Sequence, residues 1–508
     1  MHIRTHDRRG RRLRALALST VLVAGCSGSD SADDAGSSSV GSSSVESSPV
    51  ETSSVETSSV ESSPIDTAAP ASEPIDTAAP DATTATTTGI DFDPVTLTMW
   101  AGVTDSEGVV AFRGIVDRCE ADNPWLTIDY VGKDDMSTAL SAAIEAGNPP
   151  DLVQADFSGE LAGIDAGGLI EPIDELFARD GLDWGAFVPG GKELVDFNGQ
   201  HFGLPFSLDT VGLFYNQDAL TDAGIDAPPT TFEELLVAAE KLLVVNADGS
   251  IERVGFVPDV GDGSYALFLT QLFGATLFSD DGASITITDT LDQWVEALQW
   301  QKQFYDLTDT DEFIRWADGL GSYDSADNFF INGQLPLYFE GSYFITWPDR
   351  FGEGKPANWG VVPMPGPGGV ADADEVSLIP SGNWFMIPTG VDNLDASWEA
   401  LKCMALAGDE IAAFQQVYGN IPANVAALDI YEASVVPEVP AIQTFIDLAR
   451  SPAAKLPGSA VVGGALRDEV TSLILDYRRG DFSDDDLRGE LEDLQARYQE
   501  ELDLELGN

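Results

Sequence analysis

The sequence predicts an α/β fold in which mostly parallel strands are flanked by helices. Residues 95–155 supply the first observation, because strand-like apolar runs alternate there with segments whose apolar residues recur at helical spacing. Residues 196–243 supply the second, because a tight-turn dipeptide, two short apolar runs and an amphipathic segment follow one another. The chain has 508 residues, which leaves room for two or three domains.

Three strands and two helices open the folded part. We predict strands over 95–100, 126–131 and 151–155, with a helix in each of the two intervals. Strands and helices that alternate at this spacing indicate an open, mostly parallel sheet. Ligands bind such sheets beyond the carboxyl ends of the strands. Asp105, Gln154 and Asp156 follow or end these strands and are therefore candidate site residues.

The stretch 196–243 predicts a hairpin, a strand pair and a helix. The Asn198-Gly199 dipeptide is typical of a two-residue hairpin turn. We expect a strand over 201–205 that ends at Pro205, because proline cannot donate to a ladder. A second strand is predicted over 211–215, followed by a turn at 216–218.

Helix signals recur through the rest of the chain. Thr231 and Glu234 have the spacing of a capping box, and so do Thr290 and Gln293 at the start of a long amphipathic segment. Further helices are predicted over 398–407 and 411–418.

The composition excludes several classes of function. A formal net charge of −61 repels phosphate backbones, so nucleic acid is not an expected partner. The chain has only three histidines, and two of them lie within the first six residues. We therefore expect no metal site and no cofactor, and we interpret His201 as a partly exposed strand residue rather than a catalyst.

The amino terminus has the features of an export signal followed by a linker. An arginine-rich start and an apolar run over 15–25 precede Leu22-Val23-Ala24-Gly25-Cys26, which resembles a bacterial lipobox. The resemblance implies a signal peptide over 1–25 and a lipid on Cys26; twin-arginine and general secretion both stay open. Residues 26–90 are rich in Ser, Thr, Pro and acidic residues, with an apolar residue every five positions, and therefore predict a disordered tether.

The remaining chain closely resembles the bacterial extracellular solute-binding proteins, which are the carbohydrate receptors of ABC importers. The matching motifs are Ala142-Ala143 through Pro150-Asp151, Gly168 to Ile173, Leu204-Pro205-Phe206, Tyr215-Asn216, Pro228-Pro229-Thr230, Gly341-Ser342-Tyr343, Gly360 to Pro365, Ser381 to Trp384 and Gly419 to Pro422.

The resemblance implies a periplasmic-binding-protein-like fold of type II. It consists of two lobes, each with a mostly parallel sheet flanked by helices, joined by crossing strands. Lobe 1 is expected at 91–207 plus about 366–424, and lobe 2 at about 208–365 plus 425–508. The resemblance assigns Cys119 and Cys403 to one lobe, and the oxidising compartment then allows a disulfide between them, which the sequence leaves undecided.

A sugar site needs flat aromatic faces for C–H surfaces and carboxylates or amides for hydroxyl groups. By resemblance, Asp209 falls where the family places a ligand-binding carboxylate, and Tyr343 where it stacks an aromatic ring. The full set of expected ligand-binding residues is Asp105, Gln154, Asp156, Asp209, Glu340, Tyr343, Asn383 and Trp384. Each ring can instead be a core residue.

The expected function is capture of a carbohydrate between two lobes and its delivery to the permease subunits of an ABC transporter. We expect a monomer without catalytic activity, anchored through Cys26 to the outer face of the bacterial cell membrane. One alternative keeps the fold and binds a polyamine or other cationic solute through aromatic rings and carboxylates. A remote alternative is a secreted glycosidase that uses two carboxylates.

Overall fold

The computed structural model describes residues 92–133, 136–155, 167–260, 264–323, 325–366, 369–370, 377–456 and 458–507. All of them lie within one compact unit of the chain. The expected signal peptide, the lipidation site Cys26, the tether and Asp156 lie outside the described residues.

A six-stranded mixed sheet forms the centre of the first lobe. Its order is β16 (Ile421–Pro422), β6 (Leu204–Asp209), β15 (Ser381–Met386), β3 (Leu152–Ala155), β1 (Val95–Ala101) and β2 (Leu126–Gly132). β1 pairs in parallel with β2 and with β3, whereas β15 and β16 pair antiparallel with their neighbours. The helices α1 (Ser106–Asp122), α2 (Met136–Glu145), α12 (Leu394–Ala405) and α13 (Gly408–Tyr418) belong to this lobe. The predicted strand–helix–strand–helix–strand start is thus confirmed.

A three-stranded sheet forms the centre of the second lobe. β7 (Val211–Asn216) lies between β10 (Leu337–Gly341) and β11 (Trp359–Val362). Both pairings are antiparallel, so the expectation of a mostly parallel sheet is wrong for this lobe. The reason is the position of β7: the two outer strands run in the same direction, but the strand between them continues straight out of β6 in the other sheet.

Helices surround the second sheet. They are α6 (Gln217–Asp222), α7 (Phe232–Leu242), α8 (Ser264–Thr270), α9 (Leu291–Tyr305), α10 (Thr310–Asp318) and α11 (Trp347–Arg350), with 3-10 turns η3 (Gln271–Phe273) and η4 (Ser342–Thr346). Apolar residues of α7, α9, β7 and β10 form one buried cluster, which fixes the sheet against its helices.

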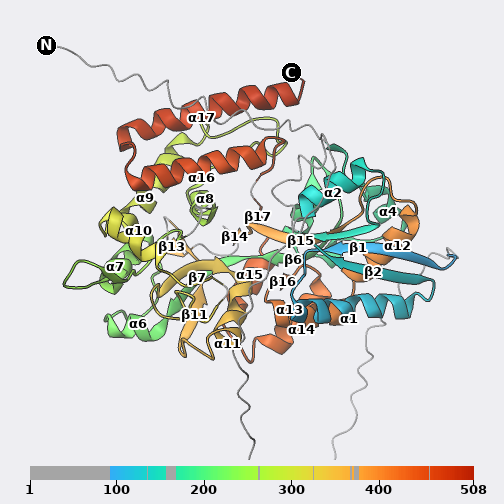
Figure 1. The fold of residues 1–508 in the computed structure, drawn as a ribbon, viewed down its shortest axis with the longest axis horizontal. Coiled ribbons are helices and arrows are strands. Elements are labelled where there is room, and N and C mark those ends of the chain that lie inside the picture. The colour runs from blue at the N-terminus through green and yellow to red at the C-terminus, as the bar shows by residue number, and fades with distance from the viewer. Residues whose placement is uncertain are drawn as a thin grey trace, which may run out of the picture. The chain divides into compact units, whose positions relative to one another are not determined.

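The chain crosses directly from one sheet to the other at Thr210. β6 belongs to the first sheet through Asp209, and β7 belongs to the second from Val211. The expected lobe boundary at 207/208 therefore falls inside β6. The chain returns between the end of β11 at Val362 and the start of β15 at Ser381. The helix α15 (Ile442–Arg450) contacts β7 and β11 as well as β16, and Figure 1 shows it between the two sheets.

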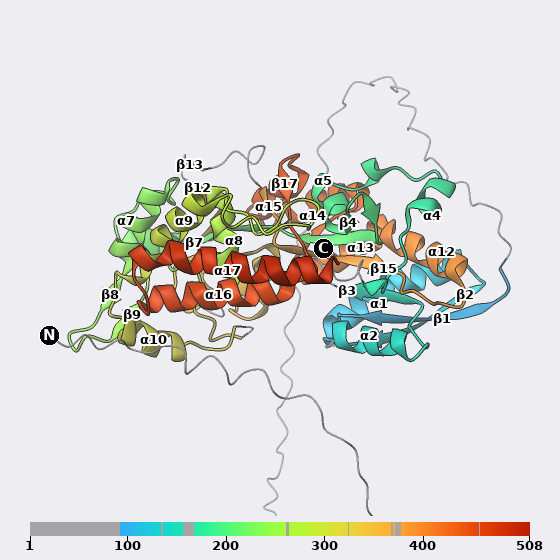
Figure 2. The ribbon, with the colours of Figure 1, turned by 90° about the horizontal axis from the view of Figure 1, so that it is seen from above.

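Two long helices close the chain. α16 (Gly463–Arg479) and α17 (Asp484–Glu505) lie side by side, and Figures 1 and 2 show them, in red, along the second lobe. They bury leucines and tyrosines against α8 and α9 in a cluster of their own. Among the described residues, no helix has both the length and the apolar character needed to span a bilayer.

Smaller elements complete the fold. They are α4 (Asp174–Arg179), η2 (Trp184–Ala186), α5 (Pro189–Val195), β4 (Asp196–Phe197), β5 (Gln200–His201), β8 (Val244–Val245), β9 (Ile251–Arg253), β12 (Pro365–Gly366), β13 (Gly369–Val370), β14 (Ser377–Leu378), α14 (Val425–Val435) and β17 (Ala454–Lys455).

The predicted hairpin is confirmed, but the strand after it does not end at Pro205. β4 and β5 pair across Asn198 and Gly199, whose φ angles are 55° and 76°, as the turn type requires. β6 instead runs through Pro205 to Asp209. The sheet tolerates this proline because β15 has a register irregularity opposite it, and β16 pairs only with Ser207 and Leu208.

Two other local predictions are corrected by side-chain contacts. The residues predicted as a turn after β7 begin helix α6, because the Asn216 side chain accepts the Ala219 N–H and caps it. Thr290 precedes α9 as predicted but makes no capping hydrogen bond; its hydroxyl oxygen accepts the Thr276 N–H instead. Thr231 does cap α7, through the Glu234 N–H.

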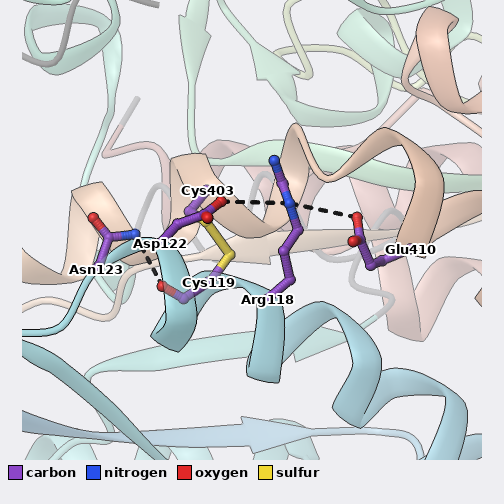
Figure 3. Close-up of a disulfide and its surroundings, with 6 residues drawn as sticks. All are labelled: Arg118, Cys119, Asp122, Asn123, Cys403 and Glu410. Atoms are coloured by element: carbon purple, nitrogen blue, oxygen red, sulfur yellow. Dashed lines mark hydrogen bonds and ion pairs between the residues drawn. A yellow bond between two sulfur atoms is a disulfide. The ribbon is translucent and has the colours of Figure 1, made fainter.

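The two internal cysteines are joined. Figure 3 shows the disulfide between Cys119 of α1 and Cys403 of α12, with a Cα–Cα distance of 5.8 Å. Beside it, the Arg118 guanidinium lies 3.5 Å from an Asp122 oxygen and 3.6 Å from a Glu410 oxygen, which ties α1 to α13. The bridge predicted as one of two outcomes therefore fastens two helices of the first lobe.

Candidate functional site

A cavity of about 440 Å³ lies beside β10 in the second lobe. Four tyrosines and two carboxylates line part of it, namely Tyr265, Tyr323, Tyr338, Tyr343, Glu340 and Asp259. Tyr265 comes from α8, Tyr343 from η4, and Glu340 and Tyr338 from β10 itself. Aromatic faces beside polar oxygens are the combination that recognises a ligand with both apolar and hydroxyl-bearing surface.

Glu340 is the centre of the hydrogen bonds in this cavity. Its side chain is 0% exposed, although the residue is part of the cavity wall, so it lies behind the phenol rings. The Tyr343 and Tyr323 hydroxyls donate to its two oxygens over 2.7 Å each. The Tyr265 and Tyr338 hydroxyls also donate to it, as does the Gly341 N–H over 2.6 Å. Such a network offsets the large cost of burying a carboxylate.

The phenols in this cluster keep their protons. Burial raises the pKa of Tyr265, Tyr323, Tyr338 and Tyr343 well above the ordinary value, and the nearby charge of Glu340 raises it further. The four hydroxyl groups are therefore neutral at any physiological pH.

A second group of polar residues lies at the ends of strands in the first lobe. The Asp209 carboxylate, at the last position of β6, accepts a hydrogen bond from the Ser381 hydroxyl over 2.6 Å and another from the Asn420 amide. The Gln154 amide donates to the Asn383 side-chain oxygen over 2.8 Å, which joins β3 to β15. The Gln154 side-chain oxygen is buried and has no hydrogen-bond partner among the described residues.

Asp105 connects this group to the second lobe. Its carboxylate caps α1 by accepting the Gly108 N–H over 2.9 Å and lies 3.5 Å from the Arg350 guanidinium of α11. Tyr418 lies close to Asp105 and Asp209. Burial raises the pKa of its phenol, and the charges of these two carboxylates add to that effect. Asp105, Asp209 and Tyr418 therefore belong to one region of the molecule.

The structure brings together only part of the expected set. Gln154 contacts Asn383, and Glu340 contacts Tyr343, but Trp384 is 0% exposed and belongs to the hydrophobic core. Trp384 therefore offers no face to a ligand, and its expected binding role is corrected to core packing. Its neighbour Asn383 remains half-buried, because successive strand residues point to opposite faces.

Sequence reasoning missed several residues of the site. Tyr265, Tyr323, Arg350, Tyr418 and Asn420 were not among the expected set. Asn420 stands within the quoted Gly419–Pro422 motif and Tyr418 directly before it, so that motif was a usable signal. Nothing in the local sequence distinguishes Tyr265 or Tyr323 from core tyrosines. Among the described residues, no group of three or more His, Cys, Asp or Glu side chains is arranged to hold a metal ion.

Comparisons with known proteins agree with this geometry. The fold and the site define a two-lobed binding protein of the periplasmic type II class, which confirms the predicted fold class. A model of the bacterial extracellular solute-binding protein family matches residues 105–411, and the chain belongs to that family. The family consists of binding proteins of ABC transporters, not enzymes.

Individual relatives cover most of the folded part. The chain is 26% identical over 410 residues to the maltotriose-binding protein of Pyrococcus abyssi, an alignment that covers 80% of this chain and 81% of that one. It is 23% identical over 296 residues to the maltooligosaccharide ABC transporter solute-binding lipoprotein of Streptococcus pneumoniae. That alignment covers 57% of this chain and 63% of the other. The solved structure of CpMnBP1 with mannotriose bound has a TM-score of 0.66 at 23% identity, covering 79% of this chain and 99% of that one.

Proposed function

We propose that this protein captures a sugar or oligosaccharide between its two lobes and delivers it to the permease of an ABC importer. The observation that carries the proposal is the tyrosine-lined cavity beside β10, in a lobe that the chain first enters at Thr210, between β6 and β7. The names of the relatives in Pyrococcus abyssi and Streptococcus pneumoniae support a saccharide as the ligand.

Closure of the two lobes is the proposed mechanism of capture. We assign lobe 1 to residues from 91 to about 209 plus about 366–424, and lobe 2 to about 211–365 plus 425–508, with hinges at the crossing near Thr210 and on the return from β11 to β15. A ligand that contacts Asp105, Asp209, Gln154 and Asn383 on one side and Tyr343 on the other favours the closed form, because only that form offers both sets of contacts.

The proposed location is the outer face of the cell membrane. Cys26 carries the lipid, and residues 26–90 hold the folded part near the permease as a flexible tether; the protein acts as a monomer. The lipobox-like segment before Cys26 supports this assignment, as does a relative that is named a lipoprotein. Replacing the anchor with Cys26→Ser should release the protein from membranes into the medium, whereas Cys119→Ser, which opens the internal disulfide but keeps Cys26, should leave it membrane-bound.

Calorimetry with purified protein tests the main proposal. The titrants are maltotriose, mannotriose and their disaccharides, with spermidine and putrescine as cationic comparisons. We expect saturable binding of a saccharide that changes little with ionic strength, because the ligand is neutral. Binding of a polyamine together with no binding of any saccharide would mean that the protein is a receptor for a cationic solute. Release of nitrophenol from an aryl glycoside would contradict a purely binding role.

A further inference from the structure

Glu340 receives more hydrogen bonds than its carboxylate can accept from separate donors. Five donors point at it, namely four tyrosine hydroxyls and the Gly341 N–H. A carboxylate offers about four lone-pair sites. Its acceptor capacity is therefore filled by the protein itself, and no oxygen of Glu340 is left for a ligand.

The same hydrogen bonds decide which way the phenols face. A tyrosine hydroxyl has one proton, so a phenol that donates to Glu340 has only oxygen lone pairs left for the cavity. Five donors exceed about four acceptor sites, so one phenol proton must be accepted by another phenol. The distances allow this, because the Tyr265 and Tyr343 oxygens are 3.0 Å apart and the Tyr323 hydroxyl lies 3.2 Å from the Tyr343 oxygen. The raised pKa values of these phenols agree with this arrangement, because none of them ionises.

We propose that Glu340 is a positioning residue, which orients Tyr265, Tyr323 and Tyr343 as hydrogen-bond acceptors for the hydroxyl groups of a neutral ligand and does not itself contact that ligand. This inference rests on the proposed function and names the polarity of the site. It replaces the direct ligand contact that the sequence led us to expect for Glu340.

The arrangement favours a polyhydroxyl ligand over a cation or an anion. An ammonium group would need a carboxylate oxygen for a close ion pair. The oxygens of Glu340 already accept from the phenols, and the other carboxylate of the wall, Asp259, is buried and accepts the Tyr265 N–H. An anion has no protons to donate to phenol oxygens that face it as acceptors. A sugar hydroxyl donates one proton, which matches a neutral acceptor without a charge to neutralise.

The first experiment compares Glu340→Gln with Glu234→Gln, the same substitution at an exposed helix start. The amide of the Glu340→Gln variant donates where the carboxylate accepted, so at least one phenol must turn its proton toward the cavity. Maltotriose and mannotriose are the probes. We expect the better-bound trisaccharide to lose at least tenfold in affinity in Glu340→Gln and to change less than twofold in Glu234→Gln.

The second experiment uses deoxyfluoro derivatives of the same trisaccharide, in which a hydroxyl that donates and accepts is replaced by fluorine, which cannot donate. At the position that faces the phenols, the wild type should lose at least tenfold in affinity, and Glu340→Gln should lose markedly less. Equal losses in both proteins at every position would overturn the inference, because a merely structural carboxylate would not change the preference for donors.

Raman spectra without ligand provide a readout that does not depend on the proposed function. The tyrosine Fermi doublet distinguishes donor from acceptor phenols, so the wild type and Glu340→Gln should differ in it. Identical doublets would overturn the inference. Tyr323→Phe serves if Glu340→Gln does not fold, because Tyr323 is 38% exposed and its loss should still weaken trisaccharide binding. Failure of the wild type to bind any saccharide would refute the proposed function and leave the Raman result to decide the orientation of the phenols.

Discussion

Asp209 keeps its carboxylate at the edge of the first sheet through two hydrogen bonds from its own lobe. The Ser381 hydroxyl and the Asn420 amide hold its two oxygens, so the side chain is fixed before any ligand arrives. Because the side chain is already ordered, binding loses less conformational entropy.

We predict that Asp209→Asn weakens saccharide binding by roughly tenfold to a hundredfold, the effect of losing one charge-assisted hydrogen bond. The variant should fold, because its amide can still face the Ser381 hydroxyl. Asp218→Asn is the matched control, since Asp218 also accepts from an asparagine, Asn358, but at the start of α6. Calorimetry measures both, and equal affinity of Asp209→Asn and wild type would remove Asp209 from the site.

The buried tyrosines predict an unusual sensitivity to alkali. The pKa values of Tyr265, Tyr338 and Tyr343 are raised in the folded protein, so near and above pH 10 the unfolded chain loses protons that the folded protein keeps. The free energy of unfolding should therefore be unaffected well below pH 10 and fall as the pH rises above it, by about 1.4 kcal/mol per pH unit for each tyrosine.

Urea unfolding at a series of alkaline pH values measures this slope. Tyr338→Phe, which removes the proton of a residue only 6% exposed, should make the slope shallower. Equal slopes for this variant and the wild type would mean that Tyr338 already ionises in the folded protein.

Neighbouring residues show how far the sequence could predict the site. Asn383 and Trp384 were both expected to bind, yet adjacent positions of one strand face opposite sides of a sheet, so only one of them can lie toward the ligand. Period-2 alternation alone could have separated them. By contrast, Tyr323 and Tyr265 contact Glu340 over sequence separations of 17 and 75 residues, and no local pattern predicts those contacts.

At the scale of elements, local signals predicted well wherever a backbone requirement is strong. The Asn-Gly hairpin, the start of α7 and the three opening strands were all located from sequence. The direction of β7 was not, because the pairing of a strand depends on which neighbours the tertiary fold places beside it and not on its own residues. The same limit explains the continuation of β6 through Pro205.

Two glycines give a matched test at this scale. Gly199 has a φ of 76°, so Gly199→Ala should lower the free energy of unfolding by about 1 kcal/mol. Gly114 lies inside α1, is exposed, and has no atom within 4 Å of an added Cβ. Gly114→Ala should raise stability by about 0.5–1 kcal/mol, because glycine is a poor helix former. Denaturant midpoints measure both, and shifts of the same sign would contradict this account.

At the scale of the whole molecule, one cation bridges the two lobes. The Arg350 guanidinium of α11 lies 3.5 Å from Asp105 and 3.6 Å from Glu107 of α1. These side chains are partly exposed, so the attraction is screened by salt and is worth at most about 1 kcal/mol. It therefore adjusts the balance between open and closed forms without determining it.

We predict that Arg350→Gln raises the dissociation constant of the saccharide by up to about fivefold at low salt. The difference from the wild type should vanish at high salt, because screening removes the same contribution. Arg315→Gln is the control, since Arg315 pairs with Glu312 within α10 and touches only one lobe. A salt-independent difference would mean that Arg350 acts by direct contact with the ligand.

The disulfide between Cys119 and Cys403 closes a covalent loop with a sequence separation of 284 residues. Every strand of the second sheet lies within this loop. If the molecule were stretched by its two ends, tension would pass from α1 straight into α12 and leave the three strands of the second sheet unloaded. About 1,000 Å of contour length would not be extended by such a force until a reductant cleaved the disulfide. A protease that cut the chain once between Cys119 and Cys403 would likewise free no fragment.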